Sequence, residues 1–96
     1  MSDKVTNKVV TKKIDTIWFE NILAGRKKFE LRLADFDIAE GDILRLEEWV
    51  GDGAERKFTG RHIEKKVAYM QKIDLKDWAA NQPEILDKGI YALQFE

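Results

Sequence analysis

The alternation of apolar and polar positions predicts most of the regular structure of this chain. A side chain in a strand shares its face with the residue two positions away, so short alternating runs bounded by turn residues indicate strands. Such runs predict strands over residues 9–14, 27–33, 43–50, 56–58, 62–71 and 90–95. In the last of these strands we expect Tyr91, Leu93 and Phe95 to face the same way.

The alternation also assigns faces within the strand over residues 27–33. Its apolar residues are expected to point into the core: Phe29, Leu31 and Leu33. The polar residues then line up on the opposite face at a pitch of roughly 6.5 Å, which makes them a plausible row of ligand-binding groups: Lys28, Glu30 and Arg32. The alternative is an ordinary solvated strand face, in which neighbouring charges form ion pairs worth under about 1 kcal/mol.

Two strands carry less regular patterns. In residues 43–50, Leu44 and Leu46 share a face with Glu48, which leaves two interpretations, a strand partly buried on both faces or a bulge that resets the register. Thr59-Gly60 predicts a turn between the strands over residues 56–58 and 62–71. In the second of these strands, one face is expected to hold Ile63, Lys65, Val67 and Tyr69.

A helix is predicted between Asp15 and Gly25. The Asp15 carboxylate is expected to cap the first turn, with Ile14 and Phe19 at the two positions of a hydrophobic staple. Gly25 supplies the left-handed residue that ends such a helix. Apolar pairs four residues apart predict a buried stripe in which both aromatic rings belong to the core: Trp18 with Ile22, and Phe19 with Leu23.

Two further helical pieces are predicted over residues 74–80 and 83–87, with Gly89 closing the second. Five or six short strands and two or three helices in 96 residues, without regular strand-helix alternation, indicate an α+β fold. We therefore expect a small mixed β-barrel with helices at its ends. One domain over residues 1–96 accounts for this length, and residues 1–7 are expected to be flexible.

Composition excludes several classes of function. The chain has no cysteine and a single histidine, His62, so we expect no metal centre, no cysteine nucleophile and no cofactor. No apolar run approaches the roughly 18 residues of a membrane span, and the N-terminal segment is polar. These features predict a cytoplasmic protein without a membrane partner.

The formal net charge of −1 gives no general attraction to polyanions, so any nucleic-acid binding must come from a local patch. Two stretches are locally cationic. Residues 25–32 carry four cations and one carboxylate: Arg26, Lys27, Lys28, Arg32 and Glu30. Residues 56–66 carry five cations and one acid: Arg56, Lys57, Arg61, Lys65, Lys66 and Glu64.

Three motifs in a fixed order resemble the ASCH domains of the PUA-like superfamily. They are Gly25-Arg26-Lys27-Lys28-Phe29-Glu30-Leu31-Arg32, then Gly41-Asp42-Ile43-Leu44 continuing to Trp49, then Phe58-Thr59-Gly60-Arg61. The resemblance covers residues 14–71, and the strand over residues 89–95 also suits it. It implies a PUA-like β-barrel of five or six strands whose cleft, beside the glycine-ended helix, binds RNA or a modified nucleoside.

The resemblance implies a set of ligand-binding residues: Arg26, Lys27, Lys28, Glu30, Arg32 and Arg61. Arginine and lysine hold phosphate, a carboxylate such as Glu30 accepts hydrogen bonds from a base amino group or a ribose hydroxyl, and an exposed aromatic ring stacks on a base. Arg32 is the strongest single candidate. Lys27 and Lys28 have the alternative of being ordinary cations near a helix C-terminus, where the helix dipole favours them.

One enzymatic branch of these proteins resembles small amidohydrolases that deacetylate N4-acetylcytidine with a lysine and a threonine on this segment. Lys27 and Arg32 match that motif, whereas Glu30 takes the place of the threonine and cannot act as a hydroxyl nucleophile. If the protein is an enzyme, Lys27 would activate the substrate, Glu30 would serve as a base towards water and Arg32 would stabilise developing charge.

The third hypothesis is a domain whose edge strand docks a partner protein. The sequence leaves the ligand, any catalysis and the oligomeric state open.

Overall fold

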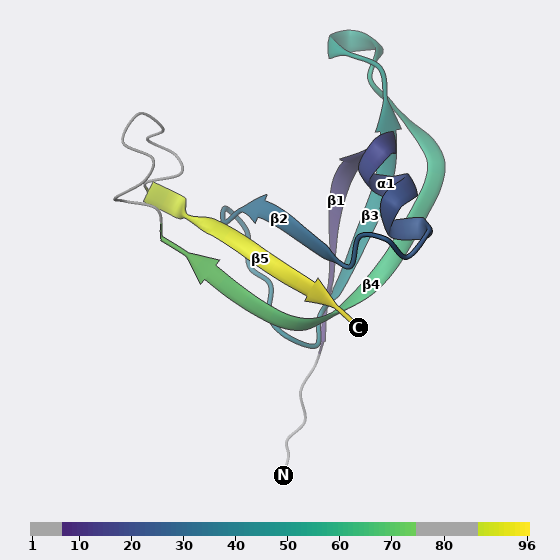
Figure 1. Cartoon of the computed structure of the whole chain (residues 1–96). Coiled ribbons are helices and arrows are strands. Elements are labelled where there is room, and N and C mark those ends of the chain that lie inside the picture. Colours follow the sequence, from purple (N-terminus) through teal and green to yellow (C-terminus); the bar gives the residue numbers. More distant parts are fainter. Residues whose placement is uncertain (1–6, 75–86) are drawn as a thin grey trace.

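The computed structural model of the chain describes residues 7–74 and 87–96 (Figure 1). The elements that lie wholly within these residues are five strands, one α-helix and one short 3₁₀ helix. In chain order they are β1 Val9–Asp15, α1 Thr16–Leu23, β2 Phe29–Leu33, β3 Ile43–Val50, η1 Gly53–Glu55, β4 Lys57–Ile73 and β5 Ile90–Phe95. The expected helices over residues 74–80 and 83–87 fall almost entirely on residues 75–86, outside the described part.

The five strands form one mixed sheet in the order β1-β3-β4-β5-β2. Strand β1 pairs parallel with β3, and every other pair is antiparallel. The 17-residue strand β4 belongs to both halves of the sheet, pairing with β3 through its first part and with β5 through its second (Figure 1). Its curvature turns the two halves towards each other, so that α1 lies on the inner side.

The small mixed sheet agrees with the sequence prediction, but closure into a barrel is not seen. Within residues 7–74 and 87–96, β1 and β2 are the two edges of the sheet and no ladder of backbone hydrogen bonds joins them. One side chain crosses between these edges, since Arg32 Nη2 donates to the Lys13 carbonyl oxygen at 2.6 Å. The open side of the sheet is therefore bridged by a single arginine.

Apolar side chains from every strand except β2, from α1 and from the loop between β2 and β3 form the core: Ile14, Phe19, Ile22, Ile38, Leu44, Leu46, Val67, Leu93 and Phe95. The prediction for β5 is confirmed, because Leu93 and Phe95 are buried and Tyr91 packs against the core. The prediction for α1 is only half right. Phe19 and Ile22 are buried, whereas Trp18 and Leu23 are about half exposed.

The exposure of Trp18 follows from the length of α1. A helix of eight residues lying on a sheet buries only a narrow stripe of side chains, and Phe19 with Ile22 already fills this stripe.

In the part of the chain that the structure describes, no helix has the length and apolar character needed to cross a membrane.

The predicted turn at Thr59-Gly60 is wrong, because both residues lie inside β4. Glu47 pairs with His62 and Trp49 pairs with Phe58, so three residues of β4 stand opposite the single residue Glu48. Gly60 has a φ of +96° and provides the backbone freedom that such a bulge needs, and the same freedom suits a turn. A second irregularity between Val67 and Tyr69 reverses the faces of β4, which is why Tyr69 is half exposed rather than aligned with Val67.

Both interpretations of residues 43–50, partial burial on two faces and a bulge, are partly correct. Leu44, Leu46 and Glu48 are buried on one face of β3, and the residues between them are partly buried on the other. The bulge exists, but its extra residues belong to β4.

The face assignment of β2 is inverted relative to the prediction. Glu30 is 5% exposed, whereas Phe29 and Leu31 are 49% and 57% exposed. Glu30 can face inwards because two cations neutralise it there, so hydrophobicity alone does not decide the orientation of this strand. The apolar side chains of β2 consequently lie on the outer face of the sheet.

Candidate functional site

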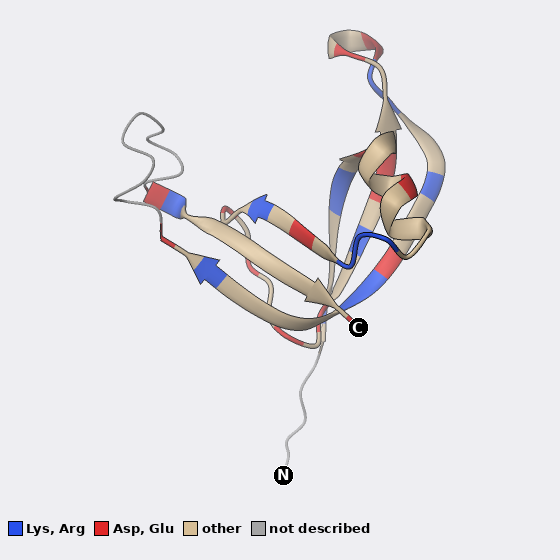
Figure 2. Cartoon of the chain, viewed as in Figure 1, with Lys and Arg blue, Asp and Glu red and all other residues tan. Residues whose placement is uncertain are grey.

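The end of α1 fixes the backbone that carries the cationic segment. Gly25, with a φ of +78°, donates its N–H to the Ile22 carbonyl, and Arg26 donates to the Asn21 carbonyl. This is the Schellman arrangement, which confirms the predicted glycine cap. The Lys27 N–H also reaches the Asn21 carbonyl, so the chain turns sharply from α1 into β2. Figure 2 shows the resulting cationic stretch between the two elements.

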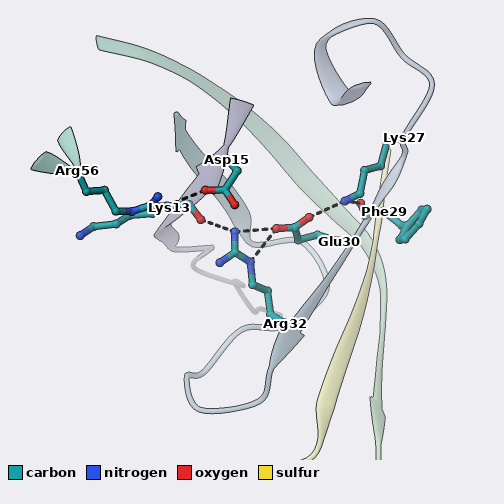
Figure 3. Close-up of polar contacts among 7 residues, drawn as sticks. All are labelled: Lys13, Asp15, Lys27, Phe29, Glu30, Arg32 and Arg56. Atoms are coloured by element: carbon teal, nitrogen blue, oxygen red, sulfur yellow. Dashed lines mark hydrogen bonds and ion pairs between the residues drawn. The ribbon is translucent and has the colours of Figure 1, made fainter. Parts of the chain in front are cut away.

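Glu30 is held between two cations. Lys27 Nζ lies 2.6 Å from Glu30 Oε1, and Arg32 Nε lies 2.7 Å from Glu30 Oε2 (Figure 3). The Lys27 ammonium also donates to the Phe29 carbonyl oxygen at 2.7 Å. Each carboxylate oxygen thus receives a charge-assisted hydrogen bond, which compensates for the burial of Glu30 and fixes the orientation of both cations.

A cleft of about 600 Å³ lies between the two edges of the sheet. Its lining combines charged and apolar side chains from β1, α1, β2 and the residues after η1. The lining residues are Lys13, Ile14, Asp15, Trp18, Lys27, Phe29, Glu30, Leu31, Arg32, Leu33 and Arg56. This volume falls within the range of small-molecule sites in proteins.

The cleft has an excess of positive charge. Four cations against two carboxylates leave a formal charge of +2. Arg56 Nη2 is 3.1 Å from Asp15 Oδ1, and the Lys13 ammonium lies 3.9 Å from the centre of the Trp49 ring. In Figure 3 the side chains of Lys13 and Arg56 lie beside each other, at the opposite end of the cleft from Lys27.

Asp15 does not play the capping role predicted for it. It occupies the N-cap position of α1, but its side chain makes no capping hydrogen bond. The carboxylate pairs with Arg56 instead. Asp15 therefore tethers the loop before β4 to the end of β1 and places Arg56 at the cleft.

The structure brings together three of the residues that the sequence predicts for the site and separates the other three. Lys27, Glu30 and Arg32 line the cleft as one hydrogen-bonded group. Arg26 and Lys28 are exposed and do not belong to the lining. Arg61 is in a different cluster, described next.

Arg61 is engaged with Glu48. Its Nε and Nη2 atoms lie 2.8 and 2.9 Å from the two oxygens of Glu48, and Nη2 also lies 2.5 Å from Glu20 Oε2. These bonds place the guanidinium 4.8 Å from the centre of the Phe19 ring. Arg61 thus joins β3 and β4 to α1.

The same cluster shifts the pKa values of its members. Hydrogen bonds from Arg61 and the Thr16 and Thr59 hydroxyls lower the pKa of Glu48 from 4.5 to about 2, although its burial opposes the shift. Hydrogen bonding to Glu48 and Glu20 raises the pKa of Arg61. Glu48 therefore stays ionised well below the pH at which an ordinary glutamate is protonated, and it neutralises Arg61.

Sequence reasoning missed three contributors to the cleft: Lys13, Trp18 and Arg56. Arg56 begins the second cationic stretch but was not assigned to the site, and Lys13 has no local pattern that marks it, since only the folding of the sheet brings these two residues, 43 positions apart, to one place. Trp18 had the helical spacing of a core residue. Its half-exposed indole is a feature that the short length of α1 could have suggested.

A smaller hollow of about 310 Å³ adjoins the cleft and shares Asp15 and Arg56 with it. Trp49 lines this hollow and stacks on Phe58 with ring centres 6.2 Å apart. Its indole Nε1 is buried without a hydrogen-bond partner among the described residues. The indole is therefore held by ring contacts, with Phe58 and with the Lys13 ammonium.

Comparison with known proteins assigns the family. Residues 11–80 match the model of the domain of unknown function DUF3850, and the chain belongs to this family. It is also 36% identical over 66 residues to an uncharacterized 12.9 kDa protein in the GpA 3′ region of Escherichia phage P2. That match covers 69% of this chain and 55% of the phage protein, so the chain matches only about half of that relative.

A solved structure shares the fold. The hypothetical protein PH0355, known from a crystal structure, superimposes with a TM-score of 0.64 over 93% of this chain and 97% of its own length. Sequence identity between the two is 19%, so the likeness concerns the fold alone.

Proposed function

We propose that this protein binds a single nucleotide, free or within an RNA, in the cleft between β1 and β2. The observation that carries the proposal is the pairing of a half-exposed indole, Trp18, with an excess of two positive charges in a cleft of about 600 Å³. A nucleotide has the matching parts, a flat base that stacks on aromatic rings and an anionic phosphate. A ligand that was only anionic would have no use for the apolar lining.

In this proposal the two ends of the cleft have different tasks. The phosphate lies at Lys13 and Arg56, whose nitrogen atoms have spare donors beyond the one bond between Arg56 and Asp15. The base lies between Trp18 and β2. Glu30 acts by holding Lys27 and Arg32 in place, because both of its oxygens already accept hydrogen bonds from them.

We also propose that the domain is an ASCH domain with a PUA-like fold, in which the sheet is an opened barrel. The order of the three sequence motifs supports this assignment, as does the curvature that brings the edges of β1 and β2 to opposite walls of one cleft. An RNA-related role would place the protein in the cytoplasm.

The test is a calorimetric titration with the four nucleoside 5′-monophosphates and with short single-stranded RNA, at low and at moderate salt. Binding that weakens as salt rises is expected, because phosphate contacts release counterions. Arg56→Gln should weaken binding about tenfold, and Lys28→Gln, on the same surface but outside the cleft, should leave it unchanged. Absence of binding to every probe at low salt contradicts the proposal.

A second candidate function rests on the hydrogen-bonded group of Lys27, Glu30 and Arg32 at the cleft wall. A lysine and a carboxylate 2.6 Å apart beside a ligand cleft suit an amidohydrolase acting on an acylated nucleoside. Incubation with N4-acetylcytidine, followed by chromatography, tests it. Turnover that Lys27→Ala abolishes and Lys28→Ala preserves is expected for this function, and intact substrate contradicts it.

A further inference from the structure

The backbone of β2 presents hydrogen-bonding groups to the cleft. Lys28 accepts from the Phe95 N–H and Ala34 donates to the Gly89 carbonyl, so the even-numbered residues of β2 exchange hydrogen bonds with β5. In an antiparallel ladder the intervening residues point their N–H and C=O groups the other way. The backbone groups of Phe29, Leu31 and Leu33 therefore face the free edge, which is the cleft wall.

Contacts within the chain occupy part of this edge. Lys27 Nζ donates to the Phe29 carbonyl, and the Asp35 N–H donates to the Leu33 carbonyl at 2.9 Å. Leu31 is left as the one residue of β2 whose free-edge N–H and C=O are both without a partner among the described residues. This residue also lies at the centre of the strand.

We infer that Leu31 reads the base of the bound nucleotide through its backbone N–H and C=O, and that the ligand is therefore an unpaired nucleobase. This inference rests on the proposed nucleotide-binding function and specifies how the same cleft recognises its ligand. The two groups form a donor and an acceptor on one side of an extended residue. The Watson–Crick edge of a nucleobase offers an adjacent acceptor and donor of the same kind, and this edge is accessible only when the base is unpaired.

The surrounding side chains suit this mode of recognition. Lys27 and Arg32, both held by Glu30, line the same cleft as Leu31. Trp18, from the facing helix, supplies an aromatic surface at the same cleft. Because the reading groups belong to the backbone, the side chain of Leu31 can remain exposed at 57% without a role in binding.

Hydrogen exchange of individual amides tests the inference, with the tightest binder among the four nucleoside 5′-monophosphates as the probe. In the free protein the Leu31 amide should exchange quickly, whereas the Glu30 and Arg32 amides, paired with β5, should be protected. A saturating nucleotide should slow exchange at Leu31 by at least about tenfold, and more than at Phe29 or Leu33. Binding without any change at Leu31, or with equal slowing at all three edge residues, overturns the inference.

Two variants at position 31 test the inference independently. Leu31→Pro removes only a free-edge N–H, which an edge strand tolerates, and should weaken nucleotide binding at least about tenfold. Leu31→Val keeps the N–H and should bind within about twofold of the wild type. If Leu31→Pro does not fold, the same nucleotide methylated at its Watson–Crick ring nitrogen replaces it and should bind at least about tenfold more weakly. Equal affinities in either comparison overturn the inference, whereas failure of all nucleotides to bind overturns the proposed function itself.

Discussion

Two buried glutamates, Glu48 and Glu30, have similar partners and different surroundings. Both are at most 5% exposed, and both bond to an arginine and to a second side chain, which is Thr59 for Glu48 and Lys27 for Glu30. Glu48 is enclosed by β3, β4 and α1, and it lines neither the 600 Å³ cleft nor the smaller hollow beside it. Glu30 forms part of the wall of a 600 Å³ cleft.

The difference shows how the same chemistry serves the fold in one place and a candidate site in the other. Arg61 directs Nε and Nη2 at Glu48, and Nη2 also at Glu20, so this group joins β3 and β4 to α1. Glu30 divides its two oxygens between Lys27 and Arg32, and these cations keep donors that face the cleft. A buried ion pair indicates function when part of it borders an open cleft. Substitutions in the two clusters and the pH dependence of stability test this distinction.

The largest effect is expected for Glu48→Ala. Removing this carboxylate leaves a cavity at a site that is 3% exposed and takes away the shared acceptor of Thr59 and Arg61, which joins β3 to the bulge of β4. We expect the melting temperature to fall by about 10 °C or more. Thermal unfolding followed by circular dichroism measures it. Glu64→Ala, which removes an exposed partner of Arg45, is the matched control and should change the melting temperature little.

Glu30→Ala should have a smaller effect on stability and a larger one on binding. Lys27 and Arg32 lose their shared partner, but each keeps a backbone acceptor, the Phe29 carbonyl for Lys27 and the Lys13 carbonyl for Arg32. We expect a loss of about 2 kcal/mol in the free energy of unfolding, measured by urea titration, and a loss of nucleotide binding of more than about tenfold. A loss of stability as large as that of Glu48→Ala, with binding intact, would remove the contrast between the two clusters.

The pH dependence of stability should trace to Glu48. Its folded-state pKa of about 2 lies below the ordinary value of 4.5, so its contribution is complete above pH 4.5 and declines as the pH falls towards 2. Wild-type stability should therefore decrease over this window. In Glu48→Gln the decrease should be shallower, and the stability gap between the two proteins should narrow with falling pH. A gap that stays constant from pH 6 to pH 3 argues against this origin.

The smallest effect on stability is expected for Trp18→Ala, because the indole is half exposed and lies outside the core. The free energy of unfolding should change by less than about 0.5 kcal/mol. Nucleotide affinity should nevertheless fall about tenfold, since stacking on an aromatic side chain contributes roughly 1–3 kcal/mol per base. Leu23→Ala, a half-exposed apolar residue of the same helix outside the cleft lining, should leave affinity unchanged in the same titrations.

Local sequence determined the elements and several of their details. The glycine at position 25 ends α1 with the predicted hydrogen bonds, because only the residues of one helix turn are involved. The alternation of β5 predicted its buried face for a similar reason, since Leu93 and Phe95 have no polar competitor for the core. Spacing along one strand also placed Glu30 and Arg32 on the same face, although it put Lys28 and not Lys27 beside them.

Tertiary structure decided the features that depend on partners distant in sequence. The orientation of β2 was mispredicted because the burial of Glu30 depends on its cations and on the position of the strand at an open edge, which alternation does not encode. The bulge in β4 replaced a predicted turn because Glu48, on another strand, gathers Thr59 and Arg61 around it. The cleft itself, with Lys13, Trp18 and Arg56 beside β2, exists only because β4 curves through both halves of the sheet. Local interactions such as a helix cap depend only on residues that are close in sequence. The neutralisation of a buried charge and the closeness of two strand edges are properties of the folded chain.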